Sequence, residues 1–344
     1  MLSRICRFRL VFIKDISPQR LYSTGSSSKN GSKYVKPAKG LKQYFENKFS
    51  RFVKGYEIIL QNKFPSAFKV YQVFSVGTKE LYRDIKEYMR ISHDLRYGKS
   101  VRNLTRKELE IYFQIPKDMK KVVPVLLIST LPFVNYVVFP LAYLFPRYFL
   151  SSHFWSLQQR IDFALNHHKR RLYNYRPVFR HLQAKLLTIN DKDLKGKWAN
   201  ILHQASSGVH PPVNQILDVK TLFVNEPYSL RSLSSSHLSG LCRLHGLSAF
   251  PFKSSRLWNH AGFIREMDLA MEREGMSMMS LDELRRACFM RGLSPLGLHR
   301  DEMITWLNQW TLVSKNIDSR SLSLLLHCPI LLAYNYSSNW ILIH

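Results

Sequence analysis

Two short groups of cationic side chains have the residue types that bind phosphate. They comprise Lys169, Arg170 and Arg171 in NHHKRR, and Arg285, Arg286 and Arg291 in LRRACFMRGLS. Lysine and arginine in such groups neutralise phosphates and release counterions, which favours nucleic acid or anionic lipid as a partner. The same side chains also suit a solvated helix end, or support for packing, so the pattern alone leaves both interpretations open.

Common catalytic and metal-binding signatures are absent from the sequence. It contains no phosphate-binding loop, no dinucleotide-binding glycine pattern and no H-E-x-x-H, and its four cysteines are widely spaced without a CxxC. No Cys/His spacing fits zinc, and no D-x-D-x-D-G loop supports calcium binding. We therefore expect no enzyme activity, cofactor, metal or small-molecule substrate. Scattered cysteines also favour a reducing compartment over a disulfide framework.

The basic character of the chain is uneven. Overall, 51 Lys and Arg stand against 24 Asp and Glu in 344 residues, a net charge of +27. Residues 1–121 carry 27 cations against 10 acids and residues 147–200 carry 11 against 3, whereas residues 201–344 are nearly balanced. This excess predicts contact with a polyanion near the middle of the chain, such as RNA or anionic lipid headgroups.

The N-terminal 22 residues have the composition of a mitochondrial presequence. They are rich in arginine, contain one acid, Asp15, and end near RLYS. Such basic, acid-poor starts are typical of transit peptides. Residues 23–40 are rich in Ser, Gly and Lys and are expected to form a flexible linker, and residues 41–121 show helical spacing of aromatic residues between basic ones.

Residues 122–146 carry no charge but contain four prolines. As a helix this stretch would be about 36 Å long, enough to cross about 30 Å of hydrocarbon. Pro124 suits the first turn and Pro146 the end of such a helix, whereas Pro132 and Pro140 lie inside it and predict a kink. We therefore predict a single kinked transmembrane helix.

Helices and an internal repeat follow the predicted span. LSGLCRLHGLS at 238–248 aligns with LRRACFMRGLS at 284–294, with Cys242 and Cys288 at equivalent positions. Each copy reads as an amphipathic helix that ends at a glycine. A further helix carries Met303, Trp306, Leu307 and Trp310 at helical spacing. The two cysteines are expected to be small core residues.

Two regions of the chain resemble the LETM-domain family of mitochondrial inner-membrane proteins, in particular its short form without long coiled coils. The first region contains Pro132, Phe133, Pro140 and Pro146, followed by RYFLSSHFW; the second runs from LDELRRACFMRGLS to SLSLLLH. The resemblance implies an all-α protein in which one membrane helix precedes a 14-3-3-like, ribosome-binding domain. The implied segments are a presequence (1–22), a linker (23–40), a basic helical segment (41–121), the span (122–146), the domain (147–335) and a tail (336–344).

Departures from the family pattern bear on function. Members implicated in cation/proton exchange have a carboxylate where this chain has Asn135, and an amide does not titrate. The acidic pair between the repeats is reduced to Glu266 and Asp268. We therefore favour a membrane anchor over an ion pathway, and Asn135 also offers a polar group for self-association of the span.

The resemblance implies the mitochondrial ribosome as the partner, with the C-terminal domain in the matrix and the span among anionic inner-membrane lipids. Such a protein would support respiratory-chain biogenesis, mitochondrial structure and oxidative metabolism. Three alternatives stay open: a cation/proton exchanger or regulator of ion homeostasis, a nucleic-acid-binding SAP-like motif at 284–307, and residence in the outer membrane. Local charge is heavier before the span than after it, which by the positive-inside rule favours the opposite orientation.

Overall fold

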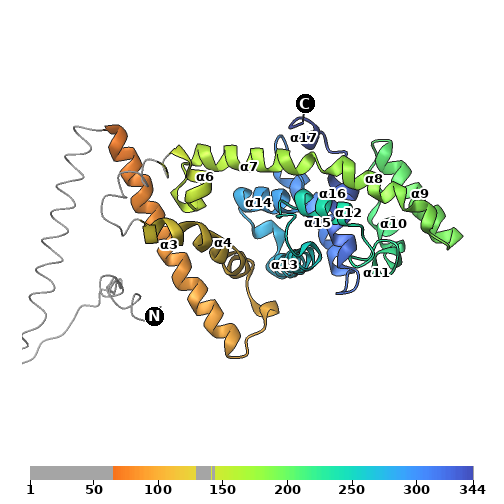
Figure 1. Ribbon diagram of the computed structural model, residues 1–344, viewed down its shortest axis with the longest axis horizontal. Helices are drawn as coiled ribbons and strands as arrows, with labels where there is room; N and C mark the ends of the chain where they lie inside the picture. Colours follow the sequence, from red (N-terminus) through yellow and green to blue (C-terminus); the bar gives the residue numbers. More distant parts are fainter. Residues whose placement is uncertain (1–64, 129–140, 142–143, 344) are drawn as a thin grey trace, which may run out of the picture. The chain divides into compact units, whose positions relative to one another are not determined.

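The computed structural model describes residues 65–128, 141 and 144–343, and every regular element in them is helical, as predicted (Figure 1). The chain divides after Pro65 into two units, and apart from Pro65 itself all the residues in the elements below belong to the second. The predicted presequence (1–22) and linker (23–40) lie outside the described residues. So do Pro132, Phe133, Asn135 and Pro140. Within the described ranges, no helix combines the length and the apolar composition that crossing a bilayer requires.

The first described elements form a helical hairpin, α3 (Pro65–Arg96) and α4 (Arg106–Ile128), joined through the short 3-10 helix η2 (Val101–Asn103). Leu81, Ile115 and Val122 are buried between the two helices. The start of α4 is capped by its own sequence, because Glu108 accepts a 2.9 Å hydrogen bond from the backbone N–H of Thr105, three residues before it.

The expectation that Pro124 lies in the first turn of a helix is wrong. Pro124 lies inside α4, a continuous helix that begins sixteen residues before 122. Residue 144 is helical and 145 is not, and Pro146 then begins a new helix, α6 (Pro146–Phe149). Proline is well tolerated at the first position of a helix because the N–H that it lacks would have no intrahelical partner there.

A series of helices follows, and its first members run along one side of the remaining domain (Figure 1). The capping box of α7 joins Ser156 to Gln159, and Asp191 caps α9 by accepting from two backbone N–H groups. The elements of this series are η3 (Ser152–Phe154), α7 (Leu157–Leu172), α8 (Tyr175–Ala184), η4 (Leu186–Thr188), α9 (Lys192–Ser206), α10 (Val213–Asp218) and α11 (Thr221–Val224).

The predicted repeat forms two successive helix pairs. In each pair a short helix ends at a glycine with positive φ, Gly246 at 68° and Gly292 at 97°. Cys242 and Cys288 are buried at equivalent positions, which confirms their predicted place in the core. The pairs are α12 (Ser235–Leu244) with α13 (Lys253–Glu274), and α14 (Leu281–Arg291) with α15 (Arg300–Lys315); η5 (Met276–Met278) lies between them.

The centre of the core is α16 (Leu322–Ala333), whose twelve residues are all buried. A helix that is apolar all round can be stable in water only when other elements surround it. It contacts α8, α11, α13 and α15. The last helix, α17 (Ser337–Trp340), lies in the segment that was predicted to be a tail. Its residue Asn339 is nevertheless buried and donates to the carbonyls of Gly292 and Ala333.

Gly292 supports a direct test of this packing. We expect Gly292→Ala to reduce the free energy of unfolding by about 2–3 kcal/mol, because about 1 kcal/mol of backbone strain is joined by a steric clash. A Cβ at this position would lie 2.2 Å from the Tyr175 Oη, which donates a 2.6 Å hydrogen bond to the Gly292 carbonyl. The measurement is urea unfolding of the full chain.

Gly208→Ala is the matched control for this prediction. Gly208 follows the end of α9, as Gly292 follows the end of α14; it has a similar φ of 90°, and a Cβ there would meet nothing within 4 Å. It should therefore show only the strain of about 1 kcal/mol. Equal losses in the two variants would mean that the contact between Gly292 and Tyr175 is unimportant.

Candidate functional site

The six predicted phosphate-binding cations fall into two classes in the structure. Lys169, Arg170, Arg285 and Arg286 keep side chains at the surface, whereas Arg171 and Arg291 are only 5% and 1% exposed. The two buried arginines are bonded within the domain and cannot reach an external phosphate. The structure therefore does not support the predicted phosphate contact at these two positions, where each arginine has a structural role.

Arg171 joins α7 to the ends of both repeat helices. Its guanidinium donates to the carbonyl of Leu244 at 2.8 Å, at the end of α12, and to the carbonyls of Phe289 and Met290, near the end of α14. The last carbonyls of a helix lack intrahelical partners and carry partial negative charge, so a cation there is favourable. The same bonds bring the two predicted basic groups together, because one ends α7 and the other lies on α14.

Arg291 forms a buried ion pair with Asp268 of α13. Its Nε and Nη2 atoms donate to Asp268 Oδ1 at 2.8 and 2.6 Å, and the Trp310 indole donates to Oδ2 at 3.0 Å. Burial raises the pKa of Asp268, while Arg291 and the indole favour its charged form. The second residue of the reduced acidic pair, Glu266, lies near Arg265 instead, with 3.7 Å between their charged atoms.

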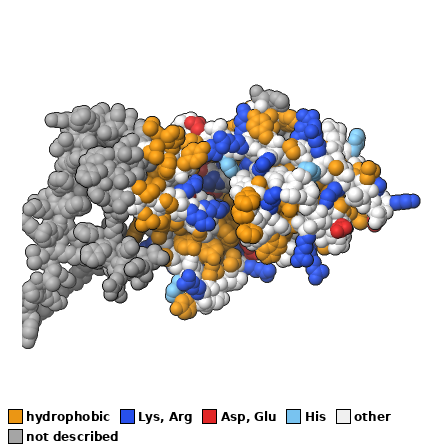
Figure 2. Space-filling view, viewed as in Figure 1, with side chains coloured by type: hydrophobic (Ala, Val, Ile, Leu, Met, Phe, Trp, Pro, Cys, Tyr) orange, Lys and Arg blue, Asp and Glu red, His pale blue; other side chains and the backbone are white. Residues whose placement is uncertain are grey.

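The four surface cations differ in their partners within the domain. Figure 2 shows that Lys and Arg side chains outnumber acids on one face of the molecule. Lys169 and Arg170 make no ion pair within the described residues, whereas Arg285 lies 3.3 Å from Asp282 and Arg286 lies 3.7 Å from Glu110. Such exposed pairs contribute about 0–1 kcal/mol, so the side chains can exchange their partners for phosphate at little cost.

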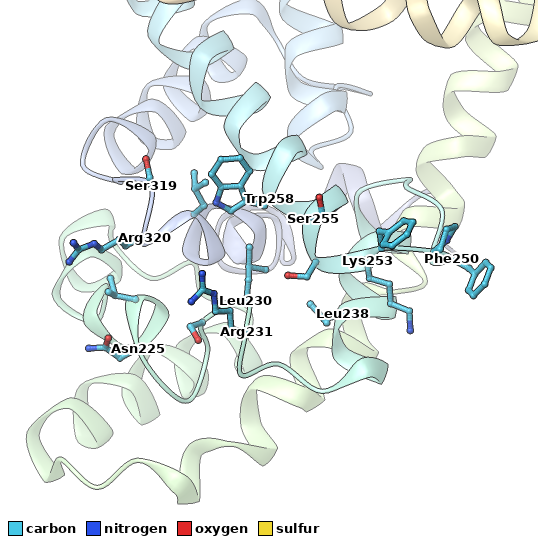
Figure 3. A pocket seen from close by; sticks show the side chains of 16 residues that line it. Asn225, Leu230, Arg231, Leu238, Phe250, Lys253, Ser255, Trp258, Ser319 and Arg320 are labelled. Carbon is cyan, nitrogen blue, oxygen red and sulfur yellow. The ribbon is translucent and has the colours of Figure 1, made fainter.

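A groove of about 1230 Å³ opens at the first turn of α13, on residues that the sequence analysis did not select. Figure 3 shows Trp258 facing Leu230 and Arg231, with Arg320 to one side and Lys253 and Phe250 to the other. No Asp or Glu is among the residues that line it. Its walls come from the segment after α11, from α12, from the start of α13 and from the loop before α16.

Three large aromatic rings at this groove are exposed to solvent. Phe250, Phe252 and Trp258 are 81%, 80% and 52% exposed. Arg256 holds the loop before α13 by donating to the carbonyls of Ser248 and Phe250. Phe252 has a φ of 55°, a left-handed conformation that costs a bulky residue about 1 kcal/mol or more. A fixed loop thus presents apolar rings to water.

A third buried polar side chain, besides Arg171 and Arg291, lies close to the predicted span. Asp118 of α4 is 2% exposed; Oδ1 accepts from Gln114 at 3.1 Å, and Oδ2 has no hydrogen-bond partner within the described residues. Burial raises the pKa of Asp118, an effect that nearby His153 opposes. His153 in turn lies 3.1 Å from Asp84 of α3 and 3.0 Å from the Ser151 hydroxyl. Across the described part of the chain, no group of three or more His, Cys, Asp or Glu side chains is arranged to hold a metal ion.

Comparison with known proteins decides the family. A family model described as "LETM1-like, RBD" matches residues 104–331, more than half of the chain. The chain belongs to the LETM1-like family. The resemblance stated from the sequence is therefore confirmed, and the match begins ahead of the predicted domain boundary at 147.

Relatives of this LETM1-like chain include "LETM1 domain-containing protein 1" of Homo sapiens, which is 31% identical over 271 residues, 78% of this chain and 75% of that protein. The protein of the same name from Xenopus tropicalis is 34% identical over 272 residues, 78% of this chain and 77% of its own length. "LETM1 domain-containing protein mdm28, mitochondrial" of Schizosaccharomyces pombe is 26% identical over 242 residues, which is 67% of this chain and 50% of that protein.

Sequence reasoning missed two sites in this LETM1-like chain, although each had a local signal. The signal for the groove is AFPFKSSRLW at 249–258, where three aromatic residues and two cations lie within nine residues, between the two repeats. Asp118 is the one acid in the run PKDMKK at 116–121, directly before the uncharged segment. In both cases the tertiary partners, rather than the spacing, reveal the chemistry.

Proposed function

We propose that this LETM1-like chain is a mitochondrial inner-membrane protein whose helical domain binds the mitochondrial ribosome. The observation that carries the proposal is the set of surface cations Lys169, Arg170, Arg285 and Arg286. They lie on a domain whose family description includes the term RBD, which we read as ribosome-binding domain. Ribosomal RNA is a dense polyanion, and such cations neutralise its phosphates. Through this contact the protein would support respiratory-chain biogenesis and organelle structure.

The mitochondrial location rests on two further supports. The name of the Schizosaccharomyces pombe relative places that protein in mitochondria, and residues 1–22 of this chain have the composition of a presequence. The uncharged segment 122–146 is the proposed anchor, among anionic lipids, with the helical domain on the matrix side. Asn135 supplies a polar group through which two anchors can pair.

The ribosome contact predicts a strong dependence on salt and on the surface cations. We expect the full-length protein in detergent to co-sediment with mitochondrial ribosomes at about 50 mM salt and to be released as salt rises, because phosphate contacts weaken steeply with ionic strength. Charge reversal at four positions (Lys169→Glu, Arg170→Glu, Arg285→Glu and Arg286→Glu) should lower the bound fraction at least tenfold. The measurement is the protein found in the ribosome pellet.

A variant with the same number of reversals on other helices controls for net charge. Arg176→Glu, Arg180→Glu, Lys192→Glu and Arg243→Glu alter exposed cations of α8, α9 and α12. We expect these changes to reduce binding far less than the first set. Equal loss in both variants would show a non-specific electrostatic contact, and unchanged binding in the first variant would exclude the proposed cations.

The SAP-like alternative loses support in the structure. Its phosphate contacts were expected from Arg285, Arg286 and Arg291, and Arg291 is held in the buried pair with Asp268. One of the three contacts is therefore unavailable to any nucleic acid.

Cation/proton exchange gains one specific observation, the buried carboxylate of Asp118. Asp118 lies four residues before the uncharged segment, and its pKa is raised. It is therefore a titratable group, whereas the amide of Asn135 is not. We still expect liposomes containing the full chain to show no proton-coupled cation flux above empty vesicles. The reason is that Asn135, at the position where exchangers have a carboxylate, cannot titrate. Flux that Asp118→Asn abolishes, and that Asp162→Asn on exposed α7 leaves intact, would establish exchange instead.

A further inference from the structure

We propose that the groove at the start of α13 binds a single-stranded segment of RNA, stacking unpaired bases on its exposed rings and placing the phosphates beside Arg231 and Arg320. The proposal rests on the proposed ribosome-binding function for the source of the RNA. It concerns a surface distinct from Lys169, Arg170, Arg285 and Arg286, none of which lines the groove.

The shape and size of the groove favour an extended polymer. Its volume of about 1230 Å³ exceeds the range of about 300–1,000 Å³ for small-molecule pockets. Being concave, it is poorly suited to the flat surface of a bilayer. Four serines and Asn225 on its walls offer hydrogen-bonding groups that match base edges and ribose hydroxyls, which lipid chains lack.

Charge in the groove is complementary to a phosphate backbone. Arg231 and Arg320 are exposed, and within the described residues their side chains form no hydrogen bond or ion pair. Lys253 is held at the rim by donating to the Ser235 hydroxyl at 2.8 Å. The absence of acids from the lining leaves this charge uncompensated. The first turn of α13, which has no side-chain cap, adds partial positive charge to that of the arginines.

The three exposed rings supply a preference for unpaired bases. Phosphate contacts alone do not supply this preference. Proteins that bind single strands combine a basic groove with aromatic platforms, because every base presents a face for stacking. In a duplex the bases are already stacked on one another and unavailable. The groove should therefore discriminate single-stranded from double-stranded RNA, whereas a purely cationic surface would not.

Fluorescence anisotropy of a labelled RNA of about twelve nucleotides, with the full-length protein in detergent, tests the proposal. We expect tighter binding of the single strand than of its duplex. Trp258→Ala should raise the Kd about tenfold, within the range expected when one stacked base is lost. Arg231→Ala and Arg320→Ala should each lower the slope of log K against log salt by about 0.7, as expected for one phosphate of a single strand.

Phe252→Gly separates binding from folding. Glycine adopts the observed φ of 55° without strain, so this variant removes a ring while preserving the backbone. It should weaken single-strand binding with no loss of thermal stability. Tyr173→Ala and Arg180→Ala are the matched controls, because both side chains are exposed and neither lines the groove.

The outcomes distinguish this site from the ribosome contact. Equal affinity for single strand and duplex, or groove variants that behave like the controls, would overturn the groove proposal. If ribosome co-sedimentation still responded to Lys169, Arg170, Arg285 and Arg286, the proposed function would stand without it. Loss of binding to anionic vesicles, with RNA binding unchanged in the groove variants, would reassign the groove to lipid. Groove-dependent RNA binding without ribosome co-sedimentation would support the groove and exclude the ribosome.

Discussion

Arg291→Met is expected to lower the free energy of unfolding by about 3–5 kcal/mol, the usual cost of leaving a buried charge without its partner. Asp268 is 2% exposed, and two of its three hydrogen bonds from Arg291 and Trp310 come from the guanidinium. Because a domain of this size has a total stability of about 5–15 kcal/mol, the variant should be only marginally folded. Urea unfolding of the full chain, followed by circular dichroism, measures the change.

A double variant distinguishes charge from packing. In Asp268→Leu/Arg291→Met both charges are absent, so the desolvation cost of the pair is removed together with its attraction. We expect this protein to be more stable than Arg291→Met alone, although Trp310 then lacks an acceptor for its indole N–H. A double variant at least as unstable as the single one would mean that shape, rather than the unpaired carboxylate, dominates the loss.

Acidification is expected to unfold the domain near pH 5. Burial lowers the pKa of His168 and His260 to about 3, of His327 to about 4 and of His237 to about 2. In the unfolded chain these imidazoles protonate near pH 6.5. The unfolded state therefore binds more protons below that pH, and stability is present above pH 6.5 and lost as the pH falls towards the folded pKa values.

The size of the acid effect follows from the number of groups. At pH 5 each such histidine removes about 2 kcal/mol, so four remove about 8 kcal/mol, comparable with the whole stability of a domain. Asp118 and Asp268 act in the opposite direction, because a carboxylate with a raised pKa holds its proton more tightly in the folded state. The histidines outnumber these two acids, and the net effect should be a steep loss of folded protein between pH 6.5 and 5.

His260→Phe tests the assignment of the acid effect to buried imidazoles. The Nε2 atom of His260 is buried without a hydrogen-bond partner, so a phenyl ring removes a titrating group and no bond to that atom. We expect the loss of stability between pH 7.5 and 5 to shrink by about 2 kcal/mol in this variant. His203→Phe, at an exposed position of α9, should leave the loss unchanged. If the two variants behave alike, burial of imidazoles is not the cause.

Local features of this LETM1-like chain could be read from the sequence because their causes are local. Ser280 and Glu283 form the capping box that their spacing predicts, and Gly246 and Gly292 end the two repeat helices with positive φ. Trp306 and Trp310, one helical turn apart, are both buried. A cap or an apolar stripe depends on neighbours within one or two turns, which the sequence specifies directly.

Only the tertiary structure decided which cations face solvent. Arg170 and Arg171 are adjacent in one basic run, yet Arg170 is exposed and Arg171 is bound to carbonyls more than seventy residues away. Successive residues of a helix point about 100° apart, so charge composition does not say which of them meets another element. The same holds for Asp118 and for the groove at Trp258, whose walls come from separate parts of the chain: the sequence supplies the side chains, and long-range packing determines whether they bind one another or an outside partner.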